Sequence, residues 1–251
     1  AGSTGPAKDV PGAKPGGTIT VYQEAGLSHL DPGQIYVSDA GQVANLLFRR
    51  LTQFQEDDKG NVSVAGDLAT DSGKSSDGGK TWTFTLKDGI KDENGNPITS
   101  ADVRHSVERL YAKFIFDGPT YLQTWLSGAD YRKALPGGGF DGKHLPASVL
   151  DTPDDKTVVF HFDQPRPDLP QTLAMAGYAV VPAKGDTKER YEKKPVSTGP
   201  YKIAENKAGK TLKLVKNTNW DPKTDSGRHQ YVDGFTIQFG VTESTQTKRL
   251  I

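Results

Sequence analysis

Residues 76–90 read SDGGKTWTFTLKDGI, and they carry the clearest structural signal in the chain. From Thr81 to Leu86, threonines alternate with large apolar residues. A period of two is typical of a β-strand with one buried and one exposed face. The DGG run before it indicates a tight turn, because glycine adopts backbone conformations closed to other residues. The stretch 80–87 is therefore predicted to be a half-exposed strand.

Four further segments show strand patterns of alternating or short apolar runs bounded by turn residues. They are residues 17–22, 156–162, 210–216 and 235–239. Turns are predicted at 29–33, where His-Leu-Asp-Pro-Gly occurs, and at Asn94-Gly95. The Gly-rich stretch 136–144 is predicted to be a loop.

Helices are expected in four places. Asp39 can cap the first of them, which is expected to place Val43, Leu46, Leu47 and Leu51 on one face. The capping-box pattern Thr99-Ser100-Ala101-Asp102 opens the second, with Val103, Val107, Leu110 and Tyr111 on one face. Residues 116–134 are partly helical in pattern, and residues 242–249 resemble the polar first turns of a helix. Strands and helices without a strict alternation, and without an internal repeat, indicate mixed α/β or α+β packing.

Composition excludes several classes of protein. The 251 residues carry 31 Lys and Arg against 31 Asp and Glu, so the basic excess expected of a nucleic-acid binder is missing. No apolar run is long enough to span a bilayer. The chain has no cysteine, which excludes disulfides and Cys-ligated metals and fits export to an oxidising space.

The two ends of the sequence are polar. Residues 1–16 are built mainly of Gly, Ala, Pro, Ser and Thr, and they are predicted to form a flexible tether. The tether is either a trimmed chain end or a spacer from a membrane anchor, and any targeting segment would precede residue 1. The first strong apolar residues of the last helix are Leu250 and Ile251. The natural protein is therefore expected to continue beyond Ile251.

No motif indicates catalysis or a cofactor. Residues 137–142 match G-x-G-x-x-G, but prolines flank them where a strand and a helix should lie. Three Gly-Lys-Ser/Thr triplets lack the first glycine of a phosphate loop. The five histidines show no zinc spacing, and no G-x-S-x-G elbow occurs. We predict no catalytic residue, no metal site, no cofactor and no nucleic-acid partner.

Four segments resemble the peptide- and nickel-type solute-binding proteins that serve ABC importers. An opening strand with a Leu30-Asp31-Pro32 turn is followed by residues 67–90, which resemble the most recognisable stretch of the family. The resemblance continues in residues 97–110, 195–201 and 217–220. It departs from the family in a longer turn at 91–95, and in Ser197, where Gly is usual.

The resemblance implies an α/β fold of the periplasmic-binding-protein-like type II, peptide-binding subclass. The chain would form most of lobe one and appear truncated, because relatives are longer and have a second lobe. Lobe one is expected to comprise residues 17–53 and 170–251, with a smaller subdomain inserted at 54–169. Two lobes would close on a solute and dock on a membrane permease.

The resemblance also implies the ligand-binding residues and partners. The loop after the first strand lies where relatives touch ligand, and Glu24 could pair with a ligand amine or be a solvated loop charge. The expected ligand-binding residues are Tyr22, Gln23, Glu24, Ala25, Gly26 and Leu27, followed by Thr120, Tyr121 and Trp125. Oligopeptides are the favoured solute, with oligosaccharides or metal chelates as alternatives on the same scaffold.

The expected location is extracytoplasmic, in the cell envelope, with an anchor through an upstream lipidated cysteine. An extracellular hydrolase, and a receptor or adhesin on the same scaffold, stay open as alternatives. A chain limited to lobe one is expected to bind solute poorly and to self-associate.

Overall fold

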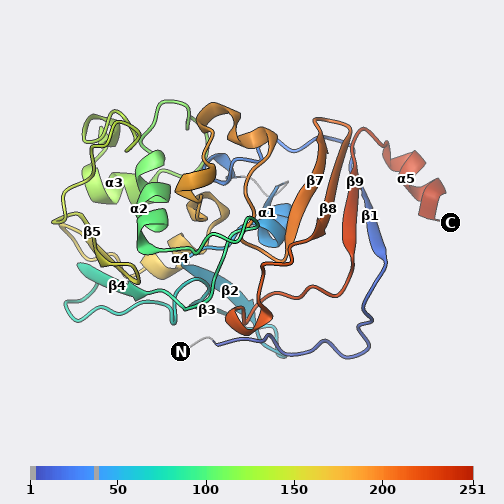
Figure 1. Ribbon diagram of the computed structural model, residues 1–251, viewed down its shortest axis with the longest axis horizontal. Helices are drawn as coiled ribbons and strands as arrows, with labels where there is room; N and C mark the ends of the chain where they lie inside the picture. Colours follow the sequence, from blue (N-terminus) through green and yellow to red (C-terminus); the bar gives the residue numbers. More distant parts are fainter. Residues whose placement is uncertain (1–3, 37–39, 251) are drawn as a thin grey trace.

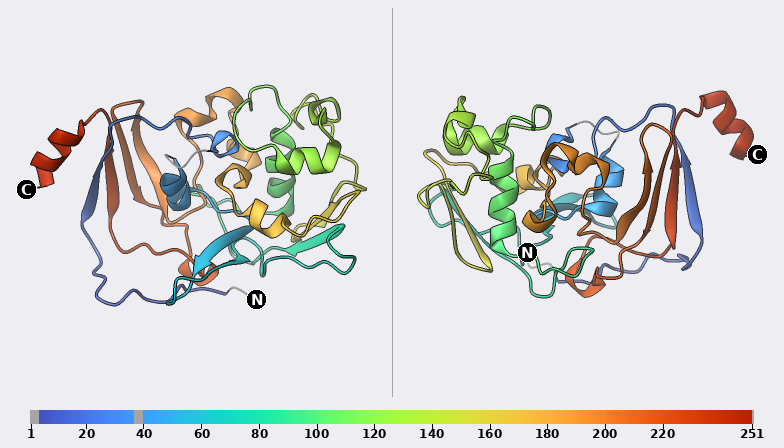
Figure 2. Two further views of the ribbon diagram at one scale, coloured as in Figure 1. Left: turned by 180° about the vertical axis from the view of Figure 1, so that it is seen from behind. Right: turned by 45° about the horizontal axis from the view of Figure 1, so that its top comes forward.

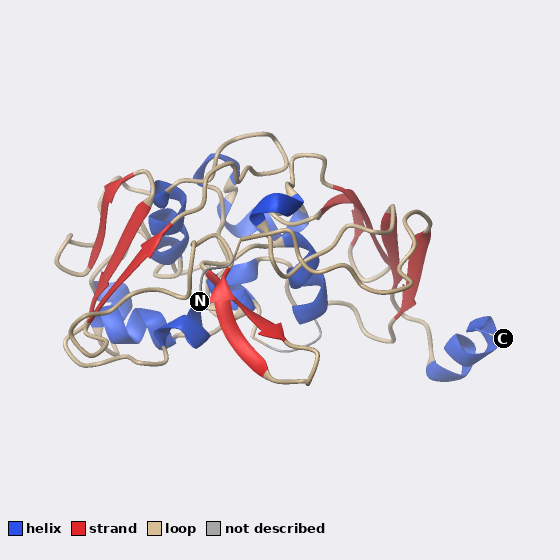
Figure 3. Ribbon diagram, turned by 90° about the horizontal axis from the view of Figure 1, so that it is seen from below, coloured by secondary structure: helices blue, strands red, loops and turns tan. Residues whose placement is uncertain are grey.

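The computed structural model describes residues 4–36 and 40–250, which form a molecule longer than it is wide (Figure 1). A four-stranded sheet in the order β1-β9-β8-β7 lies near one end, and a three-stranded sheet in the order β4-β6-β5 lies near the other. The β2-β3 pair lies between them, as the view from below shows (Figure 3). The strands are β1 (Thr18–Tyr22), β2 (Thr52–Glu56), β3 (Val62–Gly66), β4 (Thr81–Thr85), β5 (Leu150–Asp154), β6 (Thr157–His161), β7 (Tyr201–Lys207), β8 (Thr211–Lys216) and β9 (Gly234–Gln238).

The four-stranded sheet joins the two ends of the described chain. β1 pairs in parallel with β9, whereas β8 pairs antiparallel with both β9 and β7. Leu212, Leu214 and Ile237 lie on its buried face, in the same core as the helix α1 (Gly41–Leu47). The strands predicted at 17–22, 210–216 and 235–239 are thus confirmed.

The edge strand β1 extends the apolar face of this sheet beyond its cover. Ile19 pairs with Phe235 and Val21 with Ile237, so both continue the buried face. They are nevertheless 45% and 36% exposed. Their alternation with threonine therefore predicted the strand correctly but not the burial of its apolar side chains.

The first predicted helix is shorter than expected. α1 ends at Leu47, because Phe48 takes an extended conformation with φ −125° and ψ 124°. Leu51 therefore does not share a helical face with Val43, and it packs in the other hydrophobic core. The predicted cap, Asp39, lies outside the described residues.

The three-stranded sheet contains the strand predicted from residues 80–87. Phe84 is 0% exposed while Thr85 faces solvent, which confirms the alternation. The strand predicted at 156–162 is β6, the central strand of this sheet, with Val158 and Phe160 buried. In the sequence, its partner β4 ends about 70 residues before it, whereas its partner β5 is separated from it by only a short turn.

Helical segments cover this sheet and fill the middle of the molecule. α2 (Ser100–Arg109) begins as predicted, because the Thr99 amide donates to the Asp102 carboxylate at 3.0 Å. The partly helical stretch resolves into α3 (Tyr121–Ser127) and a 3-10 turn. The remaining helices are α4 (Leu169–Leu173), α5 (Glu243–Leu250) and the 3-10 segments η1 (Pro32–Gln34), η2 (Tyr131–Lys133), η3 (Ala176–Tyr178), η4 (Ala183–Gly185), η5 (Lys188–Lys193) and η6 (Pro222–Thr224). α5 projects from the end of the four-stranded sheet (Figure 2).

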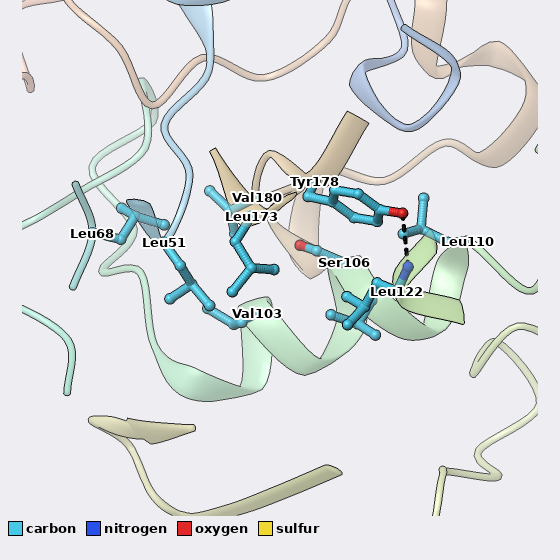
Figure 4. Close-up of a pocket in the computed structure, with 10 residues that line it drawn as sticks. Leu51, Leu68, Val103, Ser106, Leu110, Leu122, Leu173, Tyr178 and Val180 are labelled. Atoms are coloured by element: carbon cyan, nitrogen blue, oxygen red, sulfur yellow. Dashed lines mark hydrogen bonds between the residues drawn. The ribbon is translucent and has the colours of Figure 1, made fainter. Parts of the chain in front are cut away.

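Two hydrophobic cores lie side by side along the molecule. The larger is built from residues between Leu51 and Val180, and the smaller centres on α1 and the four-stranded sheet. Within the larger core, α2, α3 and η3 surround a cavity of about 10 Å³, which is barely enough for one water molecule (Figure 4). There the Leu122 amide donates to the Tyr178 hydroxyl at 3.0 Å, so the polar tip of Tyr178 is satisfied. The boundaries of the inserted subdomain stay a prediction.

Candidate functional site

The loop after β1 is fixed by backbone hydrogen bonds to the end of β9 and the segment that follows it, and its central residues are exposed. The Gln23 amide donates to Gln238 at 2.8 Å, and the Glu24 carbonyl accepts from Gly240 at 3.0 Å. The loop therefore continues the pairing of β1 with β9. Glu24, Ala25 and Gly26 are exposed, whereas the Gln23 side-chain oxygen is buried without a hydrogen-bond partner among the described residues.

The two flanks of this loop have defined surroundings. At one end, the Tyr22 ring lies 5.2 Å from the Arg249 guanidinium carbon. At the other end, Leu27 lines a hollow of about 240 Å³ together with His29, Glu192 and Phe239. The hollow offers an apolar wall beside one carboxylate and one imidazole.

His29, at the C-terminal end of the loop, connects it to two other segments of the chain. Its ring nitrogens lie 2.8 Å from the Asp117 carboxylate and 2.6 Å from that of Glu192. Burial alone would lower the pKa of His29, but the hydrogen bonds and charges of the two carboxylates outweigh it and raise that pKa. The contacts of the imidazole with both carboxylates stabilise the path of the chain from residue 27 to residue 30.

The second predicted group of site residues lies on α3. Thr120 and Tyr121 are exposed, and the Tyr121 hydroxyl lies 2.8 Å from that of Tyr36, which is 56% exposed. Trp125 is partly buried, with the Arg166 guanidinium carbon 5.2 Å from its ring centroid. Tyr36 and Tyr121 form an exposed aromatic surface, which the sequence alone did not indicate because they are 85 positions apart.

The structure does not bring the two predicted groups into one pocket. β1 and α3 lie near opposite ends of the long axis (Figure 1). The 3-10 segment η3 packs against Pro119 and Ile35, because a side chain on Gly177 would clash with the first and closely approach the second. These packing contacts put Tyr36, Tyr121 and η3 next to one another.

A buried cluster of four charged residues lies next to α1. We call it the arginine–aspartate cluster, and its members are Arg49, Asp67, Asp225 and Arg228. Arg49 donates to Asp67 at 2.8 Å, and Arg228 donates to Asp67 at 2.9 Å and to Asp225 at 3.1 Å. Burial would raise the pKa of Asp67, but the charges of Arg228 and Arg49 hold it well below its usual range. Sequence reasoning missed this cluster, because Asp67 and Arg228, which bond directly, are 161 positions apart.

A second buried group, the Arg109 cluster, fixes the Leu-Asp-Pro turn. Arg109 donates to both oxygens of Asp31, at 2.7 and 2.9 Å, and to Asp186 at 2.9 Å. His105 lies 2.8 Å from Asp186. Burial would raise the pKa of Asp186, but the hydrogen bond from His105 and the charge of Arg109 lower it to about 2. The turn is therefore held by ionic contacts, and Asp31 is a structural residue.

The described residues contain no group of three or more His, Cys, Asp and Glu side chains that could hold a metal ion. Within residues 4–36 and 40–250, no helix is long and apolar enough to cross a bilayer.

Comparison with known proteins identifies the class. The probable D,D-dipeptide-binding periplasmic protein DdpA of Escherichia coli (strain K12) is 32% identical over 216 residues, covering 83% of this chain and 37% of that protein. The oligopeptide-binding protein OppA of Bacillus subtilis (strain 168) is 26% identical over 200 residues, covering 76% of this chain and 34% of that protein. The solved structure of clavulanic acid biosynthesis oligopeptide binding protein 2 is 33% identical with a TM-score of 0.86, covering 94% of this chain and 42% of that one. The chain therefore has the α/β fold of the periplasmic peptide-binding proteins, of which it spans less than half the length.

The family follows from the same comparisons. Residues 63–251 match the family described as bacterial extracellular solute-binding proteins, family 5 Middle, and the chain belongs to this family. The resemblance inferred from the opening strand, the 67–90 stretch and the later motifs is thereby confirmed.

Proposed function

We propose that this chain is part of the substrate-binding component of an ABC importer, which captures oligopeptides outside the membrane and delivers them to a permease. The observation that carries the proposal is the similarity to an oligopeptide-binding protein at 33% identity with a TM-score of 0.86. Its relatives are named as binding proteins, which supports a role in binding and not in catalysis. Periplasmic relatives support an extracytoplasmic location, and a lipid anchor upstream is part of the proposal.

The proposed contacts with peptide are the exposed loop of residues 22–27 and the α3 surface at Thr120, Tyr121 and Trp125. The exposed Glu24 carboxylate suits a ligand amine, and aromatic rings suit apolar side chains of a peptide. Since the two groups are far apart, they would contact different parts of a ligand or of a closing second lobe.

Calorimetric titration with unmodified tripeptides and with their N-acetylated forms tests the role of Glu24. We expect Glu24→Gln to weaken binding of the free amine only, by about tenfold, as for a hydrogen bond to a charged group. Glu189→Gln, which removes another exposed carboxylate, serves as the matched control. Equal binding of both peptide forms by the unaltered protein would assign the loop contact to something other than the amine.

The same titrations separate the alternatives. A response to cello-oligosaccharides or to a metal chelate, with none to peptides, would replace the peptide in the proposal. Turnover of a peptide or glycoside library, abolished by one carboxylate substitution, would establish a hydrolase instead.

Self-association of this chain is also proposed. The exposed apolar side chains of Ile19 and Val21 on the edge strand β1 support it, since uncovered sheet edges favour pairing with another chain. Light scattering across a range of concentrations tests it, and a monomer throughout would contradict it.

A further inference from the structure

Three arginines are buried in or beside the arginine–aspartate cluster, where the described residues place two buried carboxylates. Arg49, Arg50 and Arg228 are 1%, 6% and 9% exposed, while Asp67 and Asp225 are both 0% exposed. Burying an uncompensated charge is costly, so an excess cation in such a place calls for an anion from elsewhere.

Arg50 is the guanidinium to which the described residues offer no ion pair. One of its terminal nitrogens donates to the Asn45 amide oxygen at 2.7 Å, which is a neutral acceptor. Its Nε is buried without a hydrogen-bond partner among the described residues. Burial, helped by the charge of Arg228, lowers the pKa of Arg50 to about 10, so the side chain stays charged at neutral pH.

Arg228 is buried in the same cluster, and all three of its guanidinium nitrogens donate hydrogen bonds. It donates to Asp67 and Asp225 and to the backbone carbonyls of Asn45 and Phe48. Arg50 lies beside it and takes from Asp67 only a backbone contact, in which its amide donates to the carboxylate at 2.9 Å. Asp67 and Asp225 are therefore already engaged by the other two arginines.

The Arg50 side chain lines a hollow of about 330 Å³ at the surface, which we call the Arg50 hollow. Asn45 and Gln53 supply further polar groups, and Phe54, which is 51% exposed, supplies an apolar wall. Ala176 of η3 also lines it.

We propose that the Arg50 hollow binds a carboxylate of a peptide ligand, with the Arg50 guanidinium as its partner. A carboxylate is a planar monoanion that accepts two parallel hydrogen bonds from a guanidinium. It would supply a negative charge to the buried guanidinium that the described residues leave without an ion pair. The carboxylate site depends only on residues of this chain, whereas the choice of a peptide as its bearer rests on the proposed function.

The site itself is tested by nitrogen-15 NMR of the arginine Nε–H groups. The Arg50 signal is assigned as the one missing from Arg50→Gln, with Arg190→Gln, which removes an exposed guanidinium, as the matched control. Titration with sodium acetate is expected to shift the Arg50 signal, and sodium chloride at the same ionic strength is not. No shift with acetate, an equal shift with chloride, or a response to inorganic phosphate alone would overturn the carboxylate assignment.

Peptide titrations then show which carboxylate of a peptide, that of a side chain or that of the C-terminus, binds in the Arg50 hollow. Ala-Glu-Ala against Ala-Gln-Ala reports a side-chain carboxylate, and Ala-Ala-Ala against its C-terminal amide reports the chain terminus. In one of these pairs, we expect the acid to bind at least about tenfold more tightly, and this preference to vanish in Arg50→Gln but not in Arg190→Gln. The variant Arg50→Lys, which keeps the charge but loses the paired donors, is expected to retain only part of the preference.

The outcomes distinguish this inference from the proposed function. If peptides bind but neither pair shows a preference, the peptide carboxylate is refuted while the transport role stands. If acetate shifts the Arg50 signal but no peptide binds to the full-length protein, the carboxylate site stands while the peptide proposal fails.

Discussion

The Arg109 cluster and the arginine–aspartate cluster solve the same physical problem with opposite charge balance. In the first, a single guanidinium is shared by Asp31 and Asp186, and His105 joins them. In the second, two carboxylates face the guanidiniums of Arg49 and Arg228, and Arg50 lies beside them. The first is complete within the chain, whereas the second leaves a cation at the wall of a hollow. In the Arg109 cluster ionic contacts hold the buried charges in place, whereas Arg50 keeps a buried guanidinium available for the proposed carboxylate.

The largest expected effect is on the centre of the arginine–aspartate cluster. Asp67→Asn keeps the shape of the side chain but removes the charge that both Arg49 and Arg228 contact. Breaking a buried ion pair on one side typically costs about 3–5 kcal/mol. Urea unfolding should show a loss of this size, and an unchanged midpoint would mean that the cluster contributes little to stability.

The Arg109 cluster should be sensitive to acid. The folded-state pKa of Asp186 is lowered from 3.8 to about 2, so its stabilising contribution is complete above pH 3.8 and is lost as pH falls through 2. Such a shift corresponds to about 2 kcal/mol. Asp186→Asn should lower stability at neutral pH by at least this amount and flatten its pH dependence in that window. Parallel pH profiles for the two proteins would contradict the lowered pKa.

Arg50 should matter less to stability than its neighbours, although it is nearly as buried. Arg50→Met removes a cation without an ionic partner, and replacing poorly paired buried charge by an apolar group is often neutral or stabilising. We expect a change within about 1 kcal/mol in thermal or urea unfolding. A loss of stability as large as that caused by Arg228→Met would show that Arg50 stabilises the fold as the arginine–aspartate cluster does. It would weaken the proposal that the Arg50 hollow binds a carboxylate.

The smallest effect is expected for an exposed pair. Lys8 and Asp58 lie 2.6 Å apart, but their side chains are 77% and 83% exposed. Such pairs contribute about 0–1 kcal/mol because water and salt screen them. Lys8→Gln should therefore leave the unfolding midpoint almost unchanged, and a large shift would indicate that residues 4–16 pack more tightly than their exposure implies.

Local patterns predicted the strands and helices whose signal is carried by neighbouring residues. The alternation at 80–87 and the Thr99–Asp102 box are examples, since burial and capping are decided within a few positions. The strands β2, β3, β5 and β7 were missed. β5 contains a proline, and both β5 and β7 are interrupted by irregular register, so their alternation is broken.

The candidate site could be predicted only where it follows a local motif or a resemblance. The loop of residues 22–27 came from its place after the first strand. Arg49-Arg50 was visible as a basic pair, but nothing nearby in the sequence shows that one arginine would be neutralised and the other not. Arg49 is paired by Asp67, and the same carboxylate is shared with Arg228, which the fold brings in from 161 positions away.

The pairing of β1 with β9 has a bearing on the order in which this molecule assembles. Thr18 lies opposite Gly234, so during synthesis β1 must wait until β9, far later in the chain, has been made before its backbone is paired. The entropic cost of closing so long a loop grows only slowly, by about 0.6 kcal/mol for each doubling of its length. The constraint on folding is therefore kinetic. During synthesis, the apolar side chains of Ile19 and Val21 can form non-native contacts until residue 238 has been made.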